Sequence, residues 1–231
     1  MKINGLNKTT LLDYPEHVAA TIFCGGCNFR CPFCHNSDLV LNPDSQPVIS
    51  PEEIFEFLNK RKNIISGVCI TGGEPTLQPD LADFMYQVKS LGLMVKLDTN
   101  GYRPDVLKTL VHDGLVDYIA MDIKSGITGY ALATGMPNFK GEIISESVDF
   151  IINCGVQYEF RTTVVKGIHN KKDFEEIGNL IKGCTCYYLQ NYKDSANVMI
   201  SGFAGFSKEE LESFAEIVSP YVKKIVLRGI G

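Results

Sequence analysis

The feature that most restricts the fold of this chain is a steady alternation of apolar runs and amphipathic stretches. The apolar runs cover residues 17–23, 66–70, 94–98, 117–122, 157–164, 185–190 and 222–227. The amphipathic stretches lie between or after them, at residues 51–62, 80–91, 104–113, 143–154, 171–182 and 207–219. Strands and helices in alternation predict a parallel sheet whose strands are joined by crossover helices.

Local signals mark where several of these helices begin and end. Ser50 stands before a proline and two acidic residues, and Ser207 stands three positions before Glu210, which are both patterns of helix N-termini. Gly92 and Gly155 follow two of the stretches and predict their C-terminal ends. Because no low-complexity tract or Ser/Gly linker interrupts the sequence, we expect a single domain over residues 1–231.

Polar residues recur directly after the apolar runs, in the segments 24–34, 71–74, 98–100, 122–124 and 190–192. The C-terminal ends of barrel strands meet at one mouth, so these segments are expected to lie together. A doubly wound open sheet would give the same alternation of elements, and about six strand–helix units are fewer than a closed barrel needs. Because polar residues follow strand after strand, we favour the barrel over the open sheet. The predicted fold class is α/β, a partial, laterally open (β/α)6 barrel.

Three cysteines in one short loop, Cys27, Cys31 and Cys34, have the spacing C-x3-C-x2-C. A 4Fe–4S cluster held by three thiolates leaves one iron open to a small molecule, whereas structural clusters normally use four. Cys24 extends the run to four cysteines, which also fits a zinc or electron-transfer site. Because Cys24 ends an apolar run, we interpret it as a buried thiol, and the cysteines alone leave the zinc site open.

The second motif, TGGEP at residues 71–75, follows the second apolar run. Its glycines let backbone approach a ligand, and its carboxylate can accept bonds from an ammonium or hydroxyl, although a tight turn explains the same residues. Together with the cysteine loop it resembles the radical S-adenosylmethionine (SAM) superfamily, whose members share this partial barrel. The resemblance implies that the three cysteines hold a 4Fe–4S cluster and that SAM contacts Phe33, Gly72, Gly73 and Glu74.

Four further motifs are similar to the activating enzymes of glycyl-radical proteins: CHN at 34–36, LDTNGY at 97–102, MDIK at 121–124 and FRTTVVKG at 160–167. LLDYPEHVAATIF and YYLQNY most resemble anaerobic ribonucleoside-triphosphate reductase activating proteins. This resemblance implies reductive cleavage of SAM to a 5′-deoxyadenosyl radical, which generates a glycyl radical on a partner enzyme. It also implies flavodoxin or ferredoxin as the electron donor, and no catalytic residue beyond the cluster and SAM.

The remaining polar positions are candidates for binding the cofactor. Asp98 and Asp122 would repel each other unless a cation lies between them, and the resemblance implies a monovalent cation beside the SAM carboxylate. We predict Lys124 as the partner of that carboxylate, and Asp98, Thr99 and Asp122 as cation or SAM ligands, with a solvated ion pair as the alternative. Asn100 binds the cofactor or serves as a turn residue before Gly101.

Three residues near the later strands complete the set. Arg161 lies in an apolar run and therefore needs an anionic partner, either SAM or a nearby acid. Tyr192 is a candidate contact to the nucleoside. His169 follows the run at 157–164, and we interpret it as part of a surface turn, with a contact to substrate as the alternative.

Composition narrows the function classes. A net charge of −5 gives no global attraction to nucleic acid or to anionic membranes. No stretch is long and apolar enough to span a bilayer, and no secretory signal is evident, so we expect a cytoplasmic protein. The alternatives are a radical SAM enzyme acting on a small molecule, such as a deazaguanine synthase, a non-catalytic iron–sulfur or zinc protein, and a scaffold protein.

Overall fold

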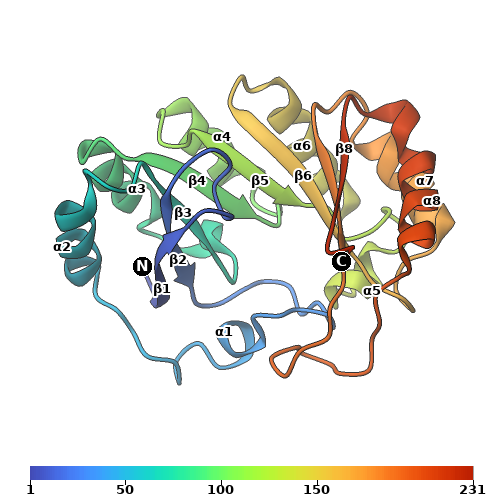
Figure 1. Ribbon diagram of the computed structural model, residues 1–231, viewed down its shortest axis with the longest axis horizontal. Coiled ribbons are helices and arrows are strands. Elements are labelled where there is room, and N and C mark those ends of the chain that lie inside the picture. Colours follow the sequence, from blue (N-terminus) through green and yellow to red (C-terminus); the bar gives the residue numbers. More distant parts are fainter. Residues whose placement is uncertain (231) are drawn as a thin grey trace. The chain divides into compact units, whose positions relative to one another are not determined.

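The computed structural model describes residues 1–230, which fall into two compact units (Figure 1). Unit 1 contains residues 1–28, 38–99 and 105–119, and unit 2 contains residues 29–37, 100–104 and 120 onward. Eight strands, β1 to β8, form one open sheet in the order of the sequence, and the boundary between the units falls within β5 (Tyr118–Asp122). The single domain stays a prediction.

Unit 1 contributes the first half of the strand order. Its strands are β1 (Ile3–Thr10), β2 (Ala19–Cys24), β3 (Gly67–Gly72) and β4 (Met94–Thr99). β1 is antiparallel to β2, whereas β2, β3 and β4 run parallel. The helices in this part of the chain are α1 (Ser37–Leu41), α2 (Pro51–Arg61), η1 (Pro75–Leu77), α3 (Leu81–Ser90) and α4 (Pro104–His112).

Unit 2 contributes β6 (Gln157–Val164), β7 (Tyr187–Asn191) and β8 (Ile225–Arg228), which are parallel to one another. Its helices are α5 (Tyr130–Thr134), α6 (Gly141–Asn153), α7 (Lys171–Leu180), α8 (Lys208–Val218) and η2 (Ser219–Tyr221). Helices α7 and α8 lie side by side next to β7 and β8 (Figure 1). Counting from β2, six strand–helix units precede β8, as the predicted (β/α)6 arrangement requires.

The predicted elements and their signals are confirmed. Each predicted apolar run overlaps a strand, and Ser50 and Ser207 each form a capping box with the glutamate three positions later. Gly92 and Gly155 follow α3 and α6 with φ of 79° and 80°, a left-handed conformation that glycine adopts without strain. The sequence did not predict β1, which has no apolar run of its own.

The two faces of the sheet differ in polarity, and the candidate site is expected on the polar face. In unit 1, Thr21, Cys69 and Lys96 share one register row. The next row, on the opposite face, holds Ile22, Ile70 and Leu97, all fully buried. Since side chains alternate between the faces of a strand, one face is apolar and the other carries the polar and charged side chains.

Candidate cofactor site

Two of the three predicted cluster ligands lie in unit 2 and are presented by one turn. The Cys34 N–H donates to the Cys31 carbonyl at 3.0 Å, and Cys31 is buried whereas Cys34 is half-buried. Residues 197–200 are hydrogen-bonded to this turn. The Met199 N–H donates to the Cys34 carbonyl and the Ile200 N–H to the Pro32 carbonyl. Burial raises the pKa of the Cys31 thiol to about 11, and the charge of Lys124 opposes that shift.

Cys27 lies in unit 1, directly after two glycines, Gly25 and Gly26, whose backbone N–H groups both donate hydrogen bonds. The Gly25 N–H donates to the Lys2 carbonyl at 3.0 Å, and the Gly26 N–H to the Leu39 carbonyl at 2.8 Å. Cys27 is half-buried and not in a disulfide. Within residues 1–230 the structure assembles no group of three His, Cys, Asp or Glu side chains around a metal position. The fit to a cluster therefore rests on the donor chemistry. One loop carries three thiols that are not in disulfides, and the Lys124 charge acts on two of them, Cys31 and Cys34.

Cys24 differs from these three thiols in its environment. It ends β2, is fully buried, and shares the sheet face of Ile22. Burial raises the pKa of this thiol to about 12, as it raises the pKa of Cys31, so the position of Cys24 on the apolar face is what sets it apart. These observations support a cluster with three cysteine ligands, which stays a prediction.

The TGGEP motif forms a close backbone turn in unit 1. The Gly73 N–H donates to the Cys24 carbonyl and the Glu74 N–H to the Gly26 carbonyl, both at 2.8 Å. The Glu74 carboxylate is buried, and its Oε1 accepts from the Thr76 N–H, the Thr76 hydroxyl and, at 2.8 Å, the Thr99 hydroxyl. The fold thus brings together two predicted cofactor residues, Glu74 and Thr99, from the ends of neighbouring strands.

Adding a methyl group at Gly73 tests this close approach. A Cβ at Gly73 would overlap the Gly26 carbonyl, which is backbone and cannot move aside alone. We expect Gly73→Ala to lower the free energy of unfolding by about 3 kcal/mol and the melting temperature by about 6–12 °C. Gly5→Ala is the matched control, because the nearest atom to its added Cβ is 3.3 Å away on the Phe23 ring. Equal melting temperatures for the two variants would contradict the packing described here.

Asp98, the other acid predicted in unit 1, pairs with a residue that the sequence reasoning missed. The Lys96 ammonium forms an ion pair with Asp98 and lies 3.8 Å from the Cys69 sulfur, although Lys96 is only 1% exposed. The Thr71 hydroxyl also donates to Asp98, at 3.2 Å. A lysine inside the apolar run 94–98 was the signal that could have revealed this pair, because a buried charge requires a partner.

In unit 2 the fold joins three predicted residues, Asp122, Lys124 and Arg161. Asp122 Oδ2 accepts from the Lys124 ammonium at 2.9 Å, and Oδ1 accepts from Arg161 Nε at 2.8 Å. Burial alone would raise the pKa of Asp122, but the charges of Arg161 and Lys124 outweigh it and hold that pKa well below its usual range. Burial would lower the pKa of Lys124, yet Asp122 and Cys31 raise it. Asp98 and Asp122 therefore each have a cationic side chain in their own unit.

The three remaining candidates also lie in unit 2. Phe33 is buried, with its ring edge-on to the His169 ring at 6.1 Å between centroids. Asn100 accepts from the Tyr102 N–H at 3.0 Å, as a turn residue does. Tyr192 is buried, donates to Asp194 at 3.0 Å and lies 5.3 Å from the His35 ring. The surface-turn interpretation of His169 is wrong, because only 5% of that residue is exposed.

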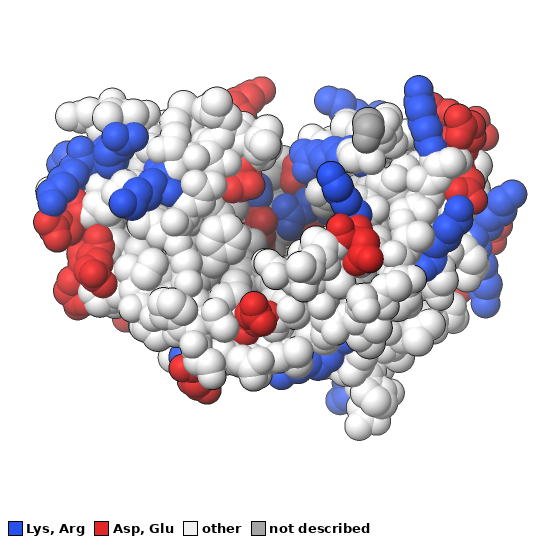
Figure 2. Space-filling model, turned by 60° about the horizontal axis from the view of Figure 1, so that its bottom comes forward, with Lys and Arg blue, Asp and Glu red and all other residues white. Residues whose placement is uncertain are grey.

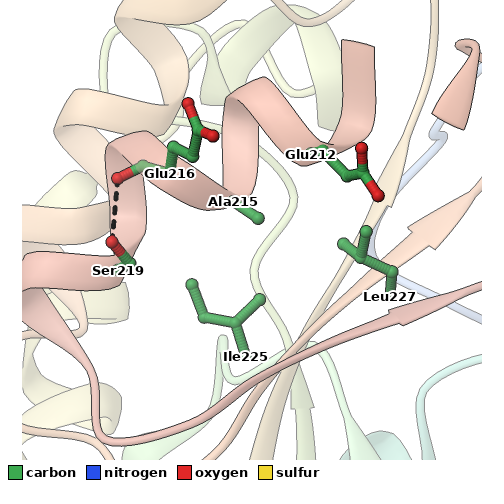
Figure 3. Close-up of a pocket in the computed structure, with 6 residues that line it drawn as sticks. All are labelled: Glu212, Ala215, Glu216, Ser219, Ile225 and Leu227. Atoms are coloured by element: carbon green, nitrogen blue, oxygen red, sulfur yellow. Dashed lines mark hydrogen bonds between the residues drawn. The ribbon is translucent and has the colours of Figure 1, made fainter. Parts of the chain in front are cut away.

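A pocket of about 360 Å³ lies apart from these residues, between α8 and β8 (Figure 3). Figure 3 shows Ala215, Ile225 and Leu227 on its walls and the acidic side chains Glu212 and Glu216 on the helix. None of the predicted cofactor residues lines it, so we do not assign SAM to this pocket.

Surface charge and helix length bear on whether the protein binds nucleic acid or a membrane. On the face shown in Figure 2, the described basic side chains are mixed with acidic ones and form no continuous basic surface. Among residues 1–230, no helix has the length and apolar character needed to cross a membrane.

Comparison with known proteins identifies the family of this chain. The family model of the radical SAM superfamily matches residues 21–181. The "Putative glycyl-radical enzyme activating enzyme MJ1227" of Methanocaldococcus jannaschii is 31% identical, covering 99% of this chain and 96% of that protein. The "Pyruvate formate-lyase-activating enzyme" of Clostridium pasteurianum is 28% identical, covering 78% of this chain and 76% of that protein. A "Probable GTP 3',8-cyclase" of Sulfurisphaera tokodaii is 27% identical over 88% of this chain and 64% of its own length.

The fold is shared with solved structures. Streptococcus suis SuiB bound to S-adenosylmethionine superposes with a TM-score of 0.67 at 15% identity over 89% of this chain, which spans about half (49%) of the SuiB chain. The predicted fold class, a partial (β/α)6 barrel, is confirmed by this likeness and by the open sheet. Because the family model covers more than half of the chain and a relative of nearly equal length is 31% identical, the chain belongs to the radical SAM superfamily.

Proposed function

We propose that this chain is an activating enzyme for a glycyl-radical protein. The observation that carries the proposal is the similarity, over 99% of the chain, to a protein named as such an activating enzyme. The similarity to a pyruvate formate-lyase-activating enzyme points the same way. Membership of the superfamily implies a 4Fe–4S cluster and SAM, and the thiols of Cys27, Cys31 and Cys34, none of which is in a disulfide, suit the cluster.

The chain's own residues bind and orient the cofactor. When bound, the reduced cluster supplies the electron that cleaves SAM to methionine and a 5′-deoxyadenosyl radical. Gly72 and Gly73 bring backbone close to the methionine end, and Glu74, fixed by Thr76 and Thr99, offers a carboxylate to its ammonium group. Lys124 offers a cation to the SAM carboxylate, and Phe33 an apolar ring to the adenine. A monovalent cation beside Asp98, Thr99 and Asp122 is part of the proposal.

The partner that we propose is an anaerobic ribonucleoside-triphosphate reductase. We also propose that reduced flavodoxin or ferredoxin is the electron donor and that the enzyme acts in the cytoplasm. The segments LLDYPEHVAATIF and YYLQNY support this choice of partner, through their resemblance to the activators of that reductase. No residue of this chain is required as a general base, because the step on the partner is the removal of a hydrogen atom from a glycine Cα.

The test has two stages. Anaerobically reconstituted protein is reduced and mixed with SAM, and we expect 5′-deoxyadenosine by chromatography. The reductase is then added, and we expect a glycyl-radical doublet by electron paramagnetic resonance that requires this protein. Glu74→Gln is the matched variant for the first stage, with product formation expected to fall about a hundredfold.

The outcomes separate the rival functions. No cleavage of SAM by protein with a full cluster would exclude the radical SAM activity. Cleavage without a radical on any glycyl-radical protein would contradict the activase proposal and favour a small-molecule substrate. A radical on a different glycyl-radical enzyme would exclude only the reductase as the partner.

A further inference from the structure

The backbone of Lys124 is held on both sides by buried aromatic residues of unit 2. The Lys124 N–H donates to the Tyr130 hydroxyl at 3.2 Å, and the Lys124 carbonyl accepts from His169 Nε2 at 2.8 Å. Tyr130 is fully buried and His169 is 5% exposed. Two buried side chains with little freedom therefore fix the backbone of a residue that lies beyond the end of β5.

The hydrogen bonds of His169 define its tautomer. Its Nδ1 accepts from the Val165 N–H at 3.0 Å, which places the ring proton on Nε2, where it is donated to the Lys124 carbonyl. Burial lowers the pKa of His169, which agrees with a neutral ring. Nε2 therefore connects the loop after β6 to the loop after β5, and Nδ1 fixes the ring within its own loop. Neither nitrogen is placed to act on a substrate proton.

His169 and the helix that begins with Tyr130 both contact the segment that carries the cysteines. The His169 ring lies against Phe33, and the last residue of α5, Thr134, accepts from the Arg30 N–H at 2.8 Å. Tyr130 begins α5 and is stacked on Phe139 at 4.4 Å between ring centroids. The Lys124 backbone and residues 30–33 are thus positioned by one set of packed side chains.

We propose that His169 and Tyr130 are positioning residues that hold Lys124 so that its ammonium group meets the carboxylate of SAM. The inference rests on the proposed function, because the role of Lys124 does. A lysine ammonium on a flexible four-carbon stem binds a carboxylate tightly only when its backbone and its partner Asp122 limit where it can lie. His169 and Tyr130 touch neither the cofactor nor the reacting atoms in this arrangement; they act through Lys124.

The experiment measures binding of SAM alone, by calorimetry, to the oxidised, cluster-loaded protein without reductant or partner. His169→Phe keeps a ring against Phe33 and removes both hydrogen bonds, and we expect about tenfold weaker binding, or about 1.4 kcal/mol. Tyr130→Phe removes only the hydroxyl and is expected to weaken binding about threefold. His169→Gln, whose amide can donate to the Lys124 carbonyl, should stay within about twofold of the wild type.

A double-mutant cycle with Lys124→Met separates positioning from general destabilisation. If His169 acts through Lys124, the loss caused by His169→Phe disappears in the Lys124→Met background. Additive losses, or equally weak binding by His169→Gln and His169→Phe, would overturn the inference. Should His169→Phe fail to fold, the cycle is run with Tyr130→Phe. Wild-type protein that does not bind SAM would instead refute the cofactor assignment of the proposed function.

Discussion

Replacing Cys31 with alanine is expected to abolish SAM cleavage, with activity below about one thousandth of wild type, a change of at least about 4 kcal/mol in the barrier. Cys31 shares its turn with Cys34 and lies beside the charge of Lys124, so its loss removes one of three thiolates from the cluster. Iron and sulfide content, the visible absorbance of the cluster and 5′-deoxyadenosine formation measure the effect. Cys27→Ala and Cys34→Ala should behave alike.

Cys24→Ala is the matched control for this prediction. It removes a neighbouring thiol that is fully buried on the apolar face of β2, at an expected cost of about 1 kcal/mol of stability. We expect it to retain the full iron content and SAM cleavage. Loss of the cluster in Cys24→Ala would show four cysteine ligands and would return the zinc or electron-transfer alternatives to consideration.

Asp122→Asn is expected to have the second-largest effect, on both stability and cofactor binding. The carboxylate of Asp122 neutralises Lys124 at 2.9 Å and Arg161 at 2.8 Å, and both cations are largely buried. Because Asp122 itself is 31% exposed, water screens part of the interaction. We expect a loss of about 2 kcal/mol in the free energy of unfolding, or about 4–8 °C in melting temperature. SAM binding should weaken about tenfold.

The pH dependence gives this prediction a direction. A carboxyl whose pKa is held low in the folded state stabilises the fold above its unfolded pKa of about 3.9, and loses that contribution as the pH falls further. The stability difference between wild type and Asp122→Asn should therefore be constant from about pH 8 to 5 and shrink below about pH 4. Urea unfolding at several pH values measures it. A difference that grew in acid would contradict the ion pairs.

Asp113→Asn is the control for the loss of a charge. Asp113 pairs with His112 at the surface, where the two side chains are 49% and 88% exposed. Such pairs contribute little, so the free energy of unfolding should change by no more than about 0.5 kcal/mol. A similar loss in Asp113→Asn and Asp122→Asn would show that net charge, and not the arrangement around Asp122, sets the stability.

Regular periodicity made most of the fold predictable. The apolar runs and amphipathic stretches correspond to β2–β8 and to the longer helices, because each such element has enough residues to show its period. Elements without such a local pattern escaped this reasoning. Helices α1 and α5 have five residues each, and β1 is held by its pairing with β2 and not by a local pattern.

The candidate site likewise has features that the sequence could show and features that it could not. The cysteine spacing and the TGGEP turn are local, so the sequence could show them. The roles of Lys96, Tyr130 and His169 were missed because burial and partners depend on neighbouring strands and loops. His169 bonds to a residue 45 positions away, and Arg161 to one 39 positions away. Contacts between residues so far apart in the sequence produce no local sequence pattern.

By itself, the sequence determined the order of strands and helices, the three cysteines in one loop, and the acids and lysine at the strand ends. Covalent spacing and side-chain periodicity are properties of the chain, and they persist whatever surrounds them. Only the tertiary structure decided which charge each acid meets, Lys96 for Asp98 and Lys124 with Arg161 for Asp122. The physical reason is that a buried charge is stable only beside its partner, and the packing of the tertiary structure decides which charges are buried.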